Sequence, residues 1–201
     1  MTFTVAILAG GQARRLHGVD KGLQLLHGRP LIESVLDVVA TMSVPRDGGN
    51  AAETHLLILA NRNIEKYSTF GISMPDDADC GDGPLAGVAT ALRACRSTWL
   101  LTVPVDCPNP PRELLSRLYS NIGRGSCAVA HDGERRQPLF ALYRSDVATS
   151  ACVAARAGQG PREWHAEINA FEVDFGDQRS QFANLNSPTD FADYEIEPRP
   201  A

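Results

Sequence analysis

The stretch LAGGQARRLHGVDKG, from Leu8 to Gly22, is the strongest indicator of the fold of this chain. It follows the apolar run Thr2 to Leu8 and combines adjacent glycines with Arg14, Arg15 and Lys21. Glycines let backbone N–H groups approach an anion, and the basic side chains supply charge, so such a turn is suited to holding phosphates. A tight strand-to-helix turn followed by solvated basic residues has the same composition. This stretch alone leaves both interpretations open.

The composition is that of a soluble globular protein. The 201 residues are 43% hydrophobic and 21% charged, and we expect a single domain over residues 1–196 with a disordered tail at 197–201. No apolar run has the length of a membrane helix, and the first residues lack a basic leader, so they are predicted to form a core strand. The sequence therefore predicts no membrane partner and a cytoplasmic location.

The charge balance excludes one class of partner. A net charge of −5 argues against a broad nucleic-acid surface, which needs many Lys and Arg contacts to phosphates. Basic residues nevertheless gather between Arg14 and Arg29. They predict a small anionic ligand, and the alternative is a solvated basic face.

The cysteine pattern predicts free thiols. The chain has five cysteines, without a CxxC pair or a metal-type histidine spacing. Free cysteines in apolar stretches behave as small hydrophobic residues, so we expect no disulfide framework, a reducing compartment and no thiol-based mechanism. These residues are Cys80, Cys95, Cys107, Cys127 and Cys152.

Apolar runs alternate with segments of helical periodicity. Strands are predicted at 2–8, 55–60, 72–74, 98–106, 126–133, 137–143 and 171–175, helices after Pro30, over 85–92, 112–122 and 146–157 and after Pro188, and loops at 44–53 and 76–84. Such alternation predicts an α/β fold with a mostly parallel central sheet covered by helices on both faces. Ligands bind beyond the carboxyl ends of the strands in such sheets.

Two common phosphate-binding motifs do not match the glycine turn. The chain has no GxxxxGK followed by Ser or Thr, and no GxGxxG with an acidic residue at the usual distance. Both the P-loop and the dinucleotide-binding interpretations are therefore weakened.

Seven segments in order resemble a different family. LAGGQARRLHGVDKG, GRPLIESV, ANR, GPLAG, VPVDCP, HDGERRQPLFALY and FANLNSPTDF span almost the whole chain. Together they resemble nucleotidyltransferases of the nucleotide-diphospho-sugar transferase superfamily and, within it, the molybdenum cofactor guanylyltransferases. The resemblance implies a three-layer Rossmann-like fold. It also implies an enzyme that transfers GMP from GTP to the molybdopterin cofactor, uses Mg²⁺ and releases pyrophosphate.

The resemblance also implies a nucleotide site. Lys21 and Arg15 would neutralise phosphate charge, and Asp106 would bind magnesium as well as act in catalysis. Asp106 could instead be a helix N-cap, and Asp77 and Asp79 lie close enough to Asp76 to blur its register. The implied GTP-binding residues are Leu8, Ala9, Gly10, Gly11, Lys21, Asp76, Pro84, Leu85, Ala86, Gly87 and Asp106.

A second group is implied on the pterin side. Arg135 and Gln137 lie in the HDGERRQ segment, whose guanidinium groups suit a phosphate, although a hairpin tip is commonly just solvated. Asn184 and Asn186 match the family's NxNxP segment and could orient phosphate or metal, or could simply form a turn before a helix.

Two positions depart from the family pattern. His17 stands where the family commonly has glycine, and Leu59 stands where related enzymes often have asparagine, which leaves Asn61 as the nearest amide. Selectivity for guanine is therefore predicted less strongly than catalysis. A cytidylyl- or sugar-phosphate nucleotidyltransferase of the same fold is the alternative enzyme. A non-catalytic carrier that delivers the cofactor to molybdoenzymes is the alternative from another class.

Overall fold

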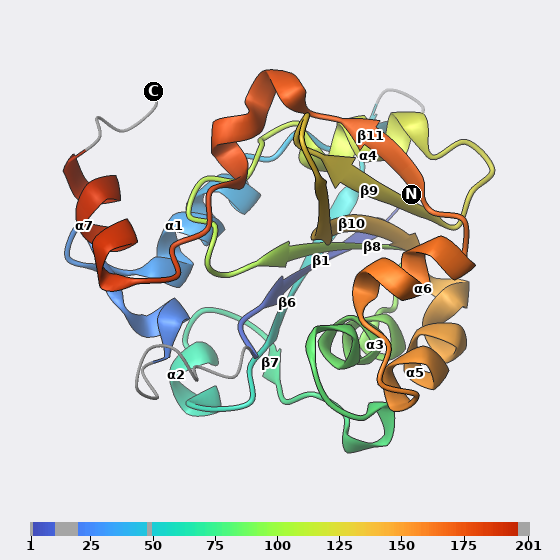
Figure 1. Cartoon of the computed structure of the whole chain (residues 1–201), viewed down its shortest axis with the longest axis horizontal. Helices are drawn as coiled ribbons and strands as arrows, with labels where there is room; N and C mark the ends of the chain where they lie inside the picture. The colour runs from blue at the N-terminus through green and yellow to red at the C-terminus, as the bar shows by residue number, and fades with distance from the viewer. Residues whose placement is uncertain (1, 11–19, 48–49, 197–201) are drawn as a thin grey trace.

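The computed structural model describes residues 2–10, 20–47 and 50–196. Its centre is a seven-stranded sheet in the order β11-β9-β10-β8-β1-β6-β7 (Figure 1). The sheet strands are β1 (Thr2–Leu8), β6 (Glu53–Leu59), β7 (Ser73–Met74), β8 (Trp99–Pro104), β9 (Cys127–His131), β10 (Arg136–Arg144) and β11 (Phe171–Asp174). The helices are α1 (Leu31–Ala40), α2 (Ile64–Tyr67), α3 (Pro84–Ala94), α4 (Leu114–Asn121), α5 (Ala148–Arg156), α6 (Pro161–Glu167) and α7 (Pro188–Ile196).

The sheet is mostly parallel, as predicted. β1 pairs in parallel with β6 on one side and with β8 on the other, and β10 alone runs antiparallel to its neighbours within this sheet. The chain moves from β1 outward to β6 and β7 and then returns through α3 to β8 on the opposite side of β1. Such a reversal of strand order opens a crevice at the carboxyl edge of an open α/β sheet.

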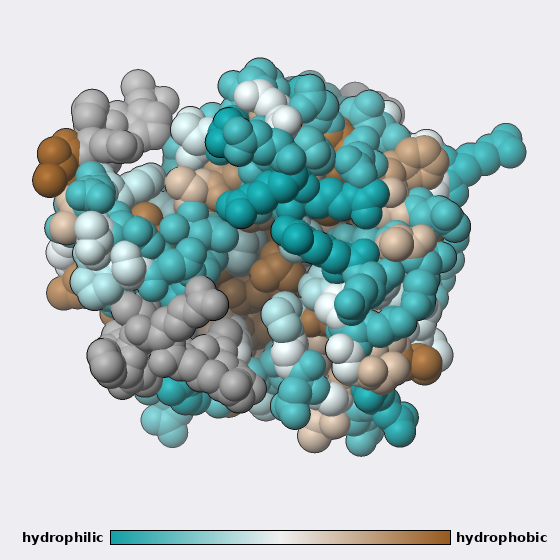
Figure 2. All heavy atoms as spheres, in the orientation of Figure 1, coloured by the Kyte–Doolittle hydropathy of each residue, from teal (hydrophilic) through white to brown (hydrophobic). Residues whose placement is uncertain are grey.

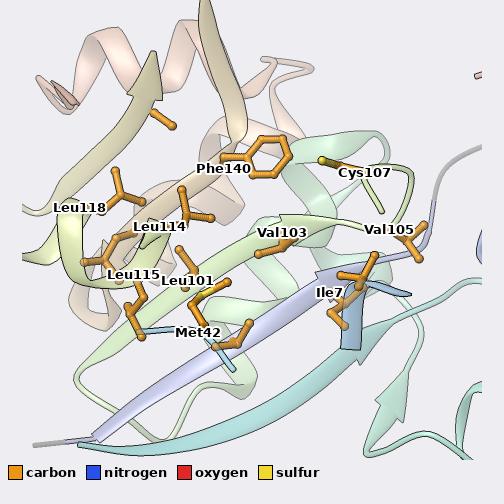
Figure 3. Packing of buried hydrophobic residues seen from close by; sticks show 14 of the residues in the cluster. Ile7, Met42, Leu101, Val103, Val105, Cys107, Leu114, Leu115, Leu118 and Phe140 are labelled. Atoms are coloured by element: carbon orange, nitrogen blue, oxygen red, sulfur yellow. The ribbon is translucent and has the colours of Figure 1, made fainter. Parts of the chain in front are cut away.

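Helices cover both faces of the sheet, and the side chains of β1 alternate between them. Phe3, Val5 and Ile7 are buried in one cluster with residues of α1 and α4, part of which Figure 3 shows. Ala6 faces the opposite cluster, which contains residues of α3, α5 and α6. This period of two is the pattern of a strand covered on both faces, and it confirms the predicted three-layer architecture.

Local sequence explains where the main helices begin. Pro84 is the first residue of α3, where the missing N–H of proline leaves no intrahelical bond unmade. The preceding Gly83 has a φ of 94°, which glycine adopts without a Cβ clash. α1 likewise begins directly after Pro30. The predicted helices of α1, α3, α4, α5 and α7 are all present, with bounds shifted by a few residues.

Other features differ from the prediction. The 44–53 segment contains two short paired strands, β4 (Arg46–Asp47) and β5 (Asn50–Ala51), and α2 and α6 lie in segments for which no helix was predicted. Near the carboxyl edge, β2 (Leu25–Leu26) and β3 (Arg29–Pro30) form a further two-stranded sheet. The described residues also form short 3-10 helices. These are η1 (Lys21–Leu23), η2 (Ala78–Cys80), η3 (Ser145–Val147) and η4 (Gly176–Phe182), the last of which precedes α7.

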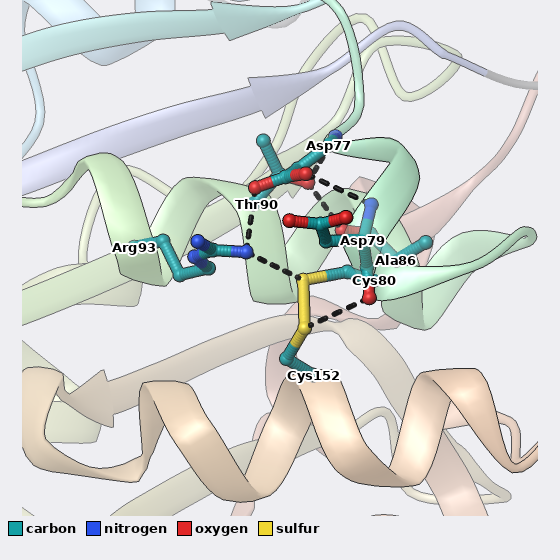
Figure 4. The surroundings of a disulfide bond; sticks show 7 residues. All are labelled: Asp77, Asp79, Cys80, Ala86, Thr90, Arg93 and Cys152. Carbon is teal, nitrogen blue, oxygen red and sulfur yellow. Dashed lines mark hydrogen bonds and ion pairs between the residues drawn. A yellow bond between two sulfur atoms is a disulfide. The ribbon is translucent and has the colours of Figure 1, made fainter.

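The prediction that the chain has no disulfide is wrong for one pair. Cys80, at the end of η2, is bonded to Cys152 of α5, with their Cα atoms 4.6 Å apart (Figure 4). The two cysteines are 72 residues apart, and only the packing of α5 beside η2 brings them together. Sequence spacing cannot reveal such a pair. Cys95, Cys107 and Cys127 are free.

Candidate active site

A cavity of about 680 Å³ opens at the carboxyl ends of β1, β6 and β8. Figure 2 shows a hollow near the middle of the viewed face, with a hydrophobic floor and hydrophilic residues around it. A volume of this size is typical of small-molecule and cofactor sites. The residues of the predicted nucleotide site that line the cavity are Leu8, Ala9, Gly10, Lys21, Asp76, Pro84, Gly87 and Asp106.

Backbone hydrogen bonds hold the three strand ends together. The amide of Ala9 donates to the carbonyl of Leu59 at 2.7 Å, and the amide of Val105 donates to the carbonyl of Leu8 at 3.1 Å. The ladder of β1 thus continues past its last residue on both sides. Because these bonds fix the first residues of the glycine turn, the chain enters this turn from a rigid base.

Lys21 and Asp106 form an ion pair on the wall of the cavity. The Lys21 ammonium lies 3.3 Å from a carboxylate oxygen of Asp106 and donates to the side-chain oxygen of Asn186 at 2.6 Å. The side chains of Lys21 and Asp106 are 24% and 22% exposed, so a ligand in the cavity can reach both. The amide of Leu185 donates to the backbone oxygen of Asp106 at 2.7 Å. The segment before α7 therefore forms part of this site.

The structure excludes the helix-cap interpretation of Asp106. The next helix, α4, begins at Leu114, and Glu113 is its N-cap residue. The Asp106 carboxylate instead points to the Lys21 ammonium. The Asp106 carboxylate is therefore free of helix capping and partly exposed, so a ligand in the cavity can contact it.

The donor set around Asp106 suits one kind of metal ion. No group of three or more His, Cys, Asp or Glu residues gathers as a metal cluster in the part of the chain that the structure describes. Mg²⁺ is commonly held by one or two carboxylates, substrate phosphates and water. Asp106, the one aspartate of the described cavity that pairs with Lys21, fits that pattern, and it does not fit a metal caged by protein ligands.

Asp76 is fixed by reciprocal hydrogen bonds with Asn61. The Asn61 amide nitrogen donates to Asp76 Oδ2 at 2.7 Å and to the Gly10 carbonyl at 3.2 Å, and Asn61 Oδ1 accepts from the Asp76 amide at 2.8 Å. The other carboxylate oxygen, Oδ1, is buried without a hydrogen-bond partner among the described atoms. Burial, followed by the charge of Asp82, raises the pKa of Asp76, although the bond from Asn61 lowers it.

Two glycines leave room for the Asp76 carboxylate. A Cβ atom on Gly10 would lie 3.3 Å from Asp76 Oδ2, and one on Gly87 would lie 3.3 Å from Oδ1. The neighbouring acid Asp77 has another role, since it accepts from the Asp79 amide at 2.9 Å and pairs with Arg93 at 2.6 Å. Among these three aspartates, it is Asp76 that lines the cavity.

Some implied nucleotide residues are not brought to the cavity. In contrast to the prediction, Leu85 and Ala86 have fully buried side chains that belong to the core cluster between α3 and the sheet. The first turn of α3 therefore meets the cavity through Pro84 and Gly87. Gly11, Arg15 and His17 lie outside the described residues.

The implied pterin-side residues divide into two groups. Gln137 donates to Asp132 within the β9–β10 hairpin, and Arg135 lies 3.8 Å from the same carboxylate with its side chain 66% exposed. Burial alone would raise the pKa of Asp132, but backbone hydrogen bonds from Arg135 and Glu134 lower this pKa below its usual value. This hairpin tip is thus tied together internally, and residues 131–137 do not line the described cavity, whereas Leu139 does.

The two asparagines near α7 also differ from each other. Asn186 bonds directly to Lys21, while the side-chain oxygen of Asn184 is buried without a hydrogen-bond partner among the described atoms. The Asn186 amide donates to Asp190 at 2.6 Å, which fixes the turn before α7. Asn186 therefore both forms a turn and reaches the candidate site.

Several cavity residues were missed by the sequence interpretation. Asp20, Asp82 and Leu139 line the cavity although none was proposed as a site residue. Asp20 carries a usable signal, because it directly precedes Lys21 in the quoted stretch. Asp82 directly precedes the GPLAG segment and Leu139 lies within HDGERRQPLFALY, but only the fold shows that these two side chains reach the cavity.

A three-layer α/β fold with a cavity of small-molecule size at the carboxyl edge, lined by a lysine and a strand-end aspartate, is the architecture of a nucleotidyltransferase-like protein. Residues 5–171 match the family model described as the MobA-like NTP transferase domain. The chain belongs to this family.

Named relatives cover most of the chain. It is 38% identical over 194 residues to a protein of Shewanella piezotolerans named molybdenum cofactor guanylyltransferase, which covers 94% of this chain and 90% of the relative. It is 37% identical over 194 residues to a protein of that name from Mannheimia succiniciproducens, covering 94% of this chain and 97% of the relative.

Solved structures share the fold. Molybdopterin-guanine dinucleotide biosynthesis protein A of Archaeoglobus fulgidus superposes with a TM-score of 0.76 at 23% identity, covering 96% of both chains. A 4-diphosphocytidyl-2C-methyl-D-erythritol synthase of Anaerococcus prevotii gives a TM-score of 0.65 at 10% identity, again covering 96% of both chains. At these identities the likeness is one of fold.

No helix in the described part of the chain has the length and apolar character needed to cross a membrane.

Proposed function

We propose that this protein transfers GMP from GTP to the molybdenum–molybdopterin cofactor, forming the guanine dinucleotide and releasing pyrophosphate. The pairing of Lys21 with Asp106 at the carboxyl edge of the sheet carries this proposal. Its support from the comparisons is the name shared by relatives that are 37–38% identical over most of the chain.

The reaction joins two anions, so its barrier is largely one of charge and position. An oxygen of the terminal phosphate of molybdopterin attacks the α-phosphorus of GTP, and the bond from that phosphorus to the oxygen bridging the β-phosphate breaks. Both electrons of the broken bond leave with pyrophosphate. The protein must hold the two phosphates in line and compensate the charge that builds up on them.

Lys21 is suited to that compensation. Its ammonium is held by Asp106 and Asn186 and remains partly exposed to the cavity, so it can donate to phosphate oxygens without a change of backbone position. A charge that is already in place when the reaction begins needs no reorganisation. Asp106 would hold Mg²⁺ together with phosphate oxygens of the substrate, and that ion would supply further positive charge when bound.

The nucleotide base would lie toward Asp76. Asp76 lines the cavity and its carboxylate has acceptor capacity left, since Oδ1 has no hydrogen-bond partner among the described atoms, so a base that offers N–H groups would suit this side chain. The Watson–Crick edge of guanine carries adjacent N–H donors, which a carboxylate can accept together. This match supports GTP over nucleotides whose bases present fewer donors.

The name shared by the relatives favours the molybdopterin cofactor as the acceptor, and a biosynthetic use of GTP favours the cytoplasm as the compartment. Molybdoenzymes that need the guanine form, or carriers that deliver it, are the expected protein partners.

The experiment is pyrophosphate release by the purified protein with molybdenum–molybdopterin, Mg²⁺ and GTP, CTP or UTP in parallel. We expect release with GTP, with little from CTP or UTP, and loss of activity with EDTA that added Mg²⁺ restores. Equal turnover with CTP would contradict the assignment of the base and favour a cytidylyltransferase. No release with any nucleotide, together with tight cofactor binding, would instead support the non-catalytic carrier.

A further inference from the structure

We propose that Asp20, clamped by Tyr67 and Asn63, is a positioning residue that fixes the short helix η1 so that Lys21 reaches between Asp106 and Asn186. The proposal rests on the GMP transfer described above. It assigns a role to α2, a four-residue helix, in the geometry of the phosphate-binding lysine.

Both carboxylate oxygens of Asp20 have their own donor. The hydroxyl of Tyr67 donates to Oδ1, and the side-chain amide of Asn63 donates to Oδ2 at 3.0 Å. The Asp20 side chain is therefore held from two directions. Asn63 precedes α2 with a φ of 51°, a left-handed conformation that asparagine tolerates better than most residues.

The Tyr67 hydroxyl is a rigid anchor. Tyr67 is fully buried in the core, with its hydroxyl directed to the cavity edge. Burial, and after it the hydrogen bond to Asp20, raise the pKa of Tyr67, so the hydroxyl keeps the proton that it donates. A phenol held by packing on all sides loses little conformational entropy when it forms this bond.

The Tyr67 hydroxyl has room only because residue 22 is a glycine. A Cβ atom at Gly22 would collide with the Tyr67 hydroxyl and would lie 3.0 Å from a methyl carbon of Val105. The hydroxyl thus contacts the chain on both sides of Lys21, through the side chain of Asp20 and the backbone of Gly22. Lys21 is the residue between these two contacts.

The clamp continues into the candidate site through η1. Asp20 is the N-cap residue of η1, and its carbonyl accepts the amide of Leu23 at 3.2 Å. With η1 fixed, the Lys21 side chain extends from a single backbone position to Asp106 and Asn186. Without the clamp, we expect the Lys21 ammonium to be distributed over several positions.

Kinetics provide the first test. Tyr67→Phe removes one hydroxyl and keeps the buried ring, so we expect kcat for pyrophosphate release to fall on the order of tenfold with little change in the KM for GTP. Tyr119→Phe is the matched control, because Tyr119 is half-buried, packs edge-on against Phe3 and Trp99 and does not line the cavity. It should leave kcat unchanged.

A double-mutant cycle separates positioning from a general structural effect. If Tyr67 acts through Lys21, Tyr67→Phe should cause no further loss of kcat in the Lys21→Ala background. The Tyr67→Phe and Asp20→Asn losses should likewise be non-additive. A full tenfold loss in the Lys21→Ala background would overturn the proposal.

Lysine NMR provides a test that does not depend on activity. The chain has only two lysines, Lys21 and Lys66, so protein labelled with ¹⁵N-lysine has two side-chain ammonium signals, which Lys66→Arg assigns. Tyr67→Phe should shift or broaden the Lys21 signal and leave the Lys66 signal unchanged. An unchanged Lys21 signal would overturn the clamp. If the wild-type protein released no pyrophosphate, the proposed function would fail, and the NMR experiment would still decide the role of Tyr67.

Discussion

The Lys21 ammonium lies 3.3 Å from the Asp106 carboxylate although 85 residues separate the two in the sequence. Both belong to segments at the carboxyl edge of the sheet, Lys21 after β1 and Asp106 after β8. Parallel pairing of these two strands brings the ammonium and the carboxylate to the same side of the sheet edge. The strand pairing thus accounts for the chemistry of this edge.

Asp106→Asn should abolish most of the activity and leave the fold intact. The substitution keeps the size of the side chain and removes its charge, so we expect a loss of about 10²–10³ in kcat. A partly exposed ion pair stabilises a protein by only about 0–1 kcal/mol, so thermal unfolding should shift by a few degrees at most. Pyrophosphate release and thermal denaturation measure the two effects.

Asp37→Asn is the control for this variant. Asp37 also accepts from a basic side chain, Arg29 at 2.8 Å, but on the exposed surface of α1. It should retain wild-type kcat. If Asp106→Asn lost stability in proportion to activity, Asp106 would have a structural role instead.

Asp76→Asn should weaken GTP binding more than turnover. The amide keeps one oxygen but places a donor where the base is expected to donate, so the KM for GTP should rise about tenfold or more. Because burial raises the pKa of Asp76, wild-type affinity for GTP should also decline as the pH falls and the carboxyl group is protonated. Asp77→Asn is the matched control. Equal KM values for the Asp76 and Asp77 variants would contradict this assignment.

Cys152→Ser should lower both stability and affinity for GTP. Its partner Cys80 ends η2, and the adjacent residues Gly81 and Asp82 line the cavity. Loss of a disulfide typically lowers the free energy of unfolding by about 2–4 kcal/mol. Without its bond to α5, the loop that carries Gly81 and Asp82 should adopt several positions at the cavity wall. Urea unfolding and titration with GTP, each with and without dithiothreitol, measure the two effects.

The reduced wild-type protein should resemble Cys152→Ser in both measurements. Cys95→Ser is the control, because Cys95 is a free thiol. If reduction changed the unfolding midpoint and left GTP affinity unaltered, the bond would support the fold without supporting the site.

The buried His165 predicts a loss of stability in mild acid. Its Nε2 atom lies 2.7 Å from the Tyr143 hydroxyl, and Nδ1 is buried without a hydrogen-bond partner among the described atoms. Burial, followed by the charge of Arg136, lowers the pKa of His165 from 6.5 to about 4. Between these two values the unfolded chain binds a proton that the folded protein does not, so stability should fall with pH by about 3 kcal/mol.

Urea unfolding across pH 7 to 4 tests this prediction. His165→Gln should flatten the pH dependence in that window, whereas the exposed His55→Gln should not. Parallel curves for the wild-type protein and His165→Gln would mean that His165 has the same pKa in the folded and unfolded states, and would contradict this prediction.

Much of the fold was predictable because its signals are local. The apolar runs of β1, β6 and β8 and the periodicity of α1 and α3 depend on neighbouring residues, so the sequence predicts them. α6 was missed, and its seven residues, which follow a turn with two glycines, are a weaker periodic signal. β4 and β5, with two residues each, are below the length at which alternation can be recognised.

The candidate site was predictable in part. Lys21, Asp106 and the start of the glycine turn lie in recognisable motifs, and the structure brings them together. Leu85 and Ala86 belong to an equally recognisable motif, but the orientation of α3 directs both into the core. A motif specifies the chemical types that a site can use, whereas the rotation of a helix decides which of them face the cavity.

By itself, the sequence determined the layered α/β architecture, the glycine turn after the first strand and the two charged residues at the carboxyl edge. These follow from local patterns of apolar residues and from family motifs. Only the tertiary structure decided the Cys80–Cys152 bond, the clamp on Asp20 and the contact of Asn186 with Lys21. Each joins segments 43 or more residues apart. Such contacts depend on how strands pair and helices pack, and those are properties of the whole chain.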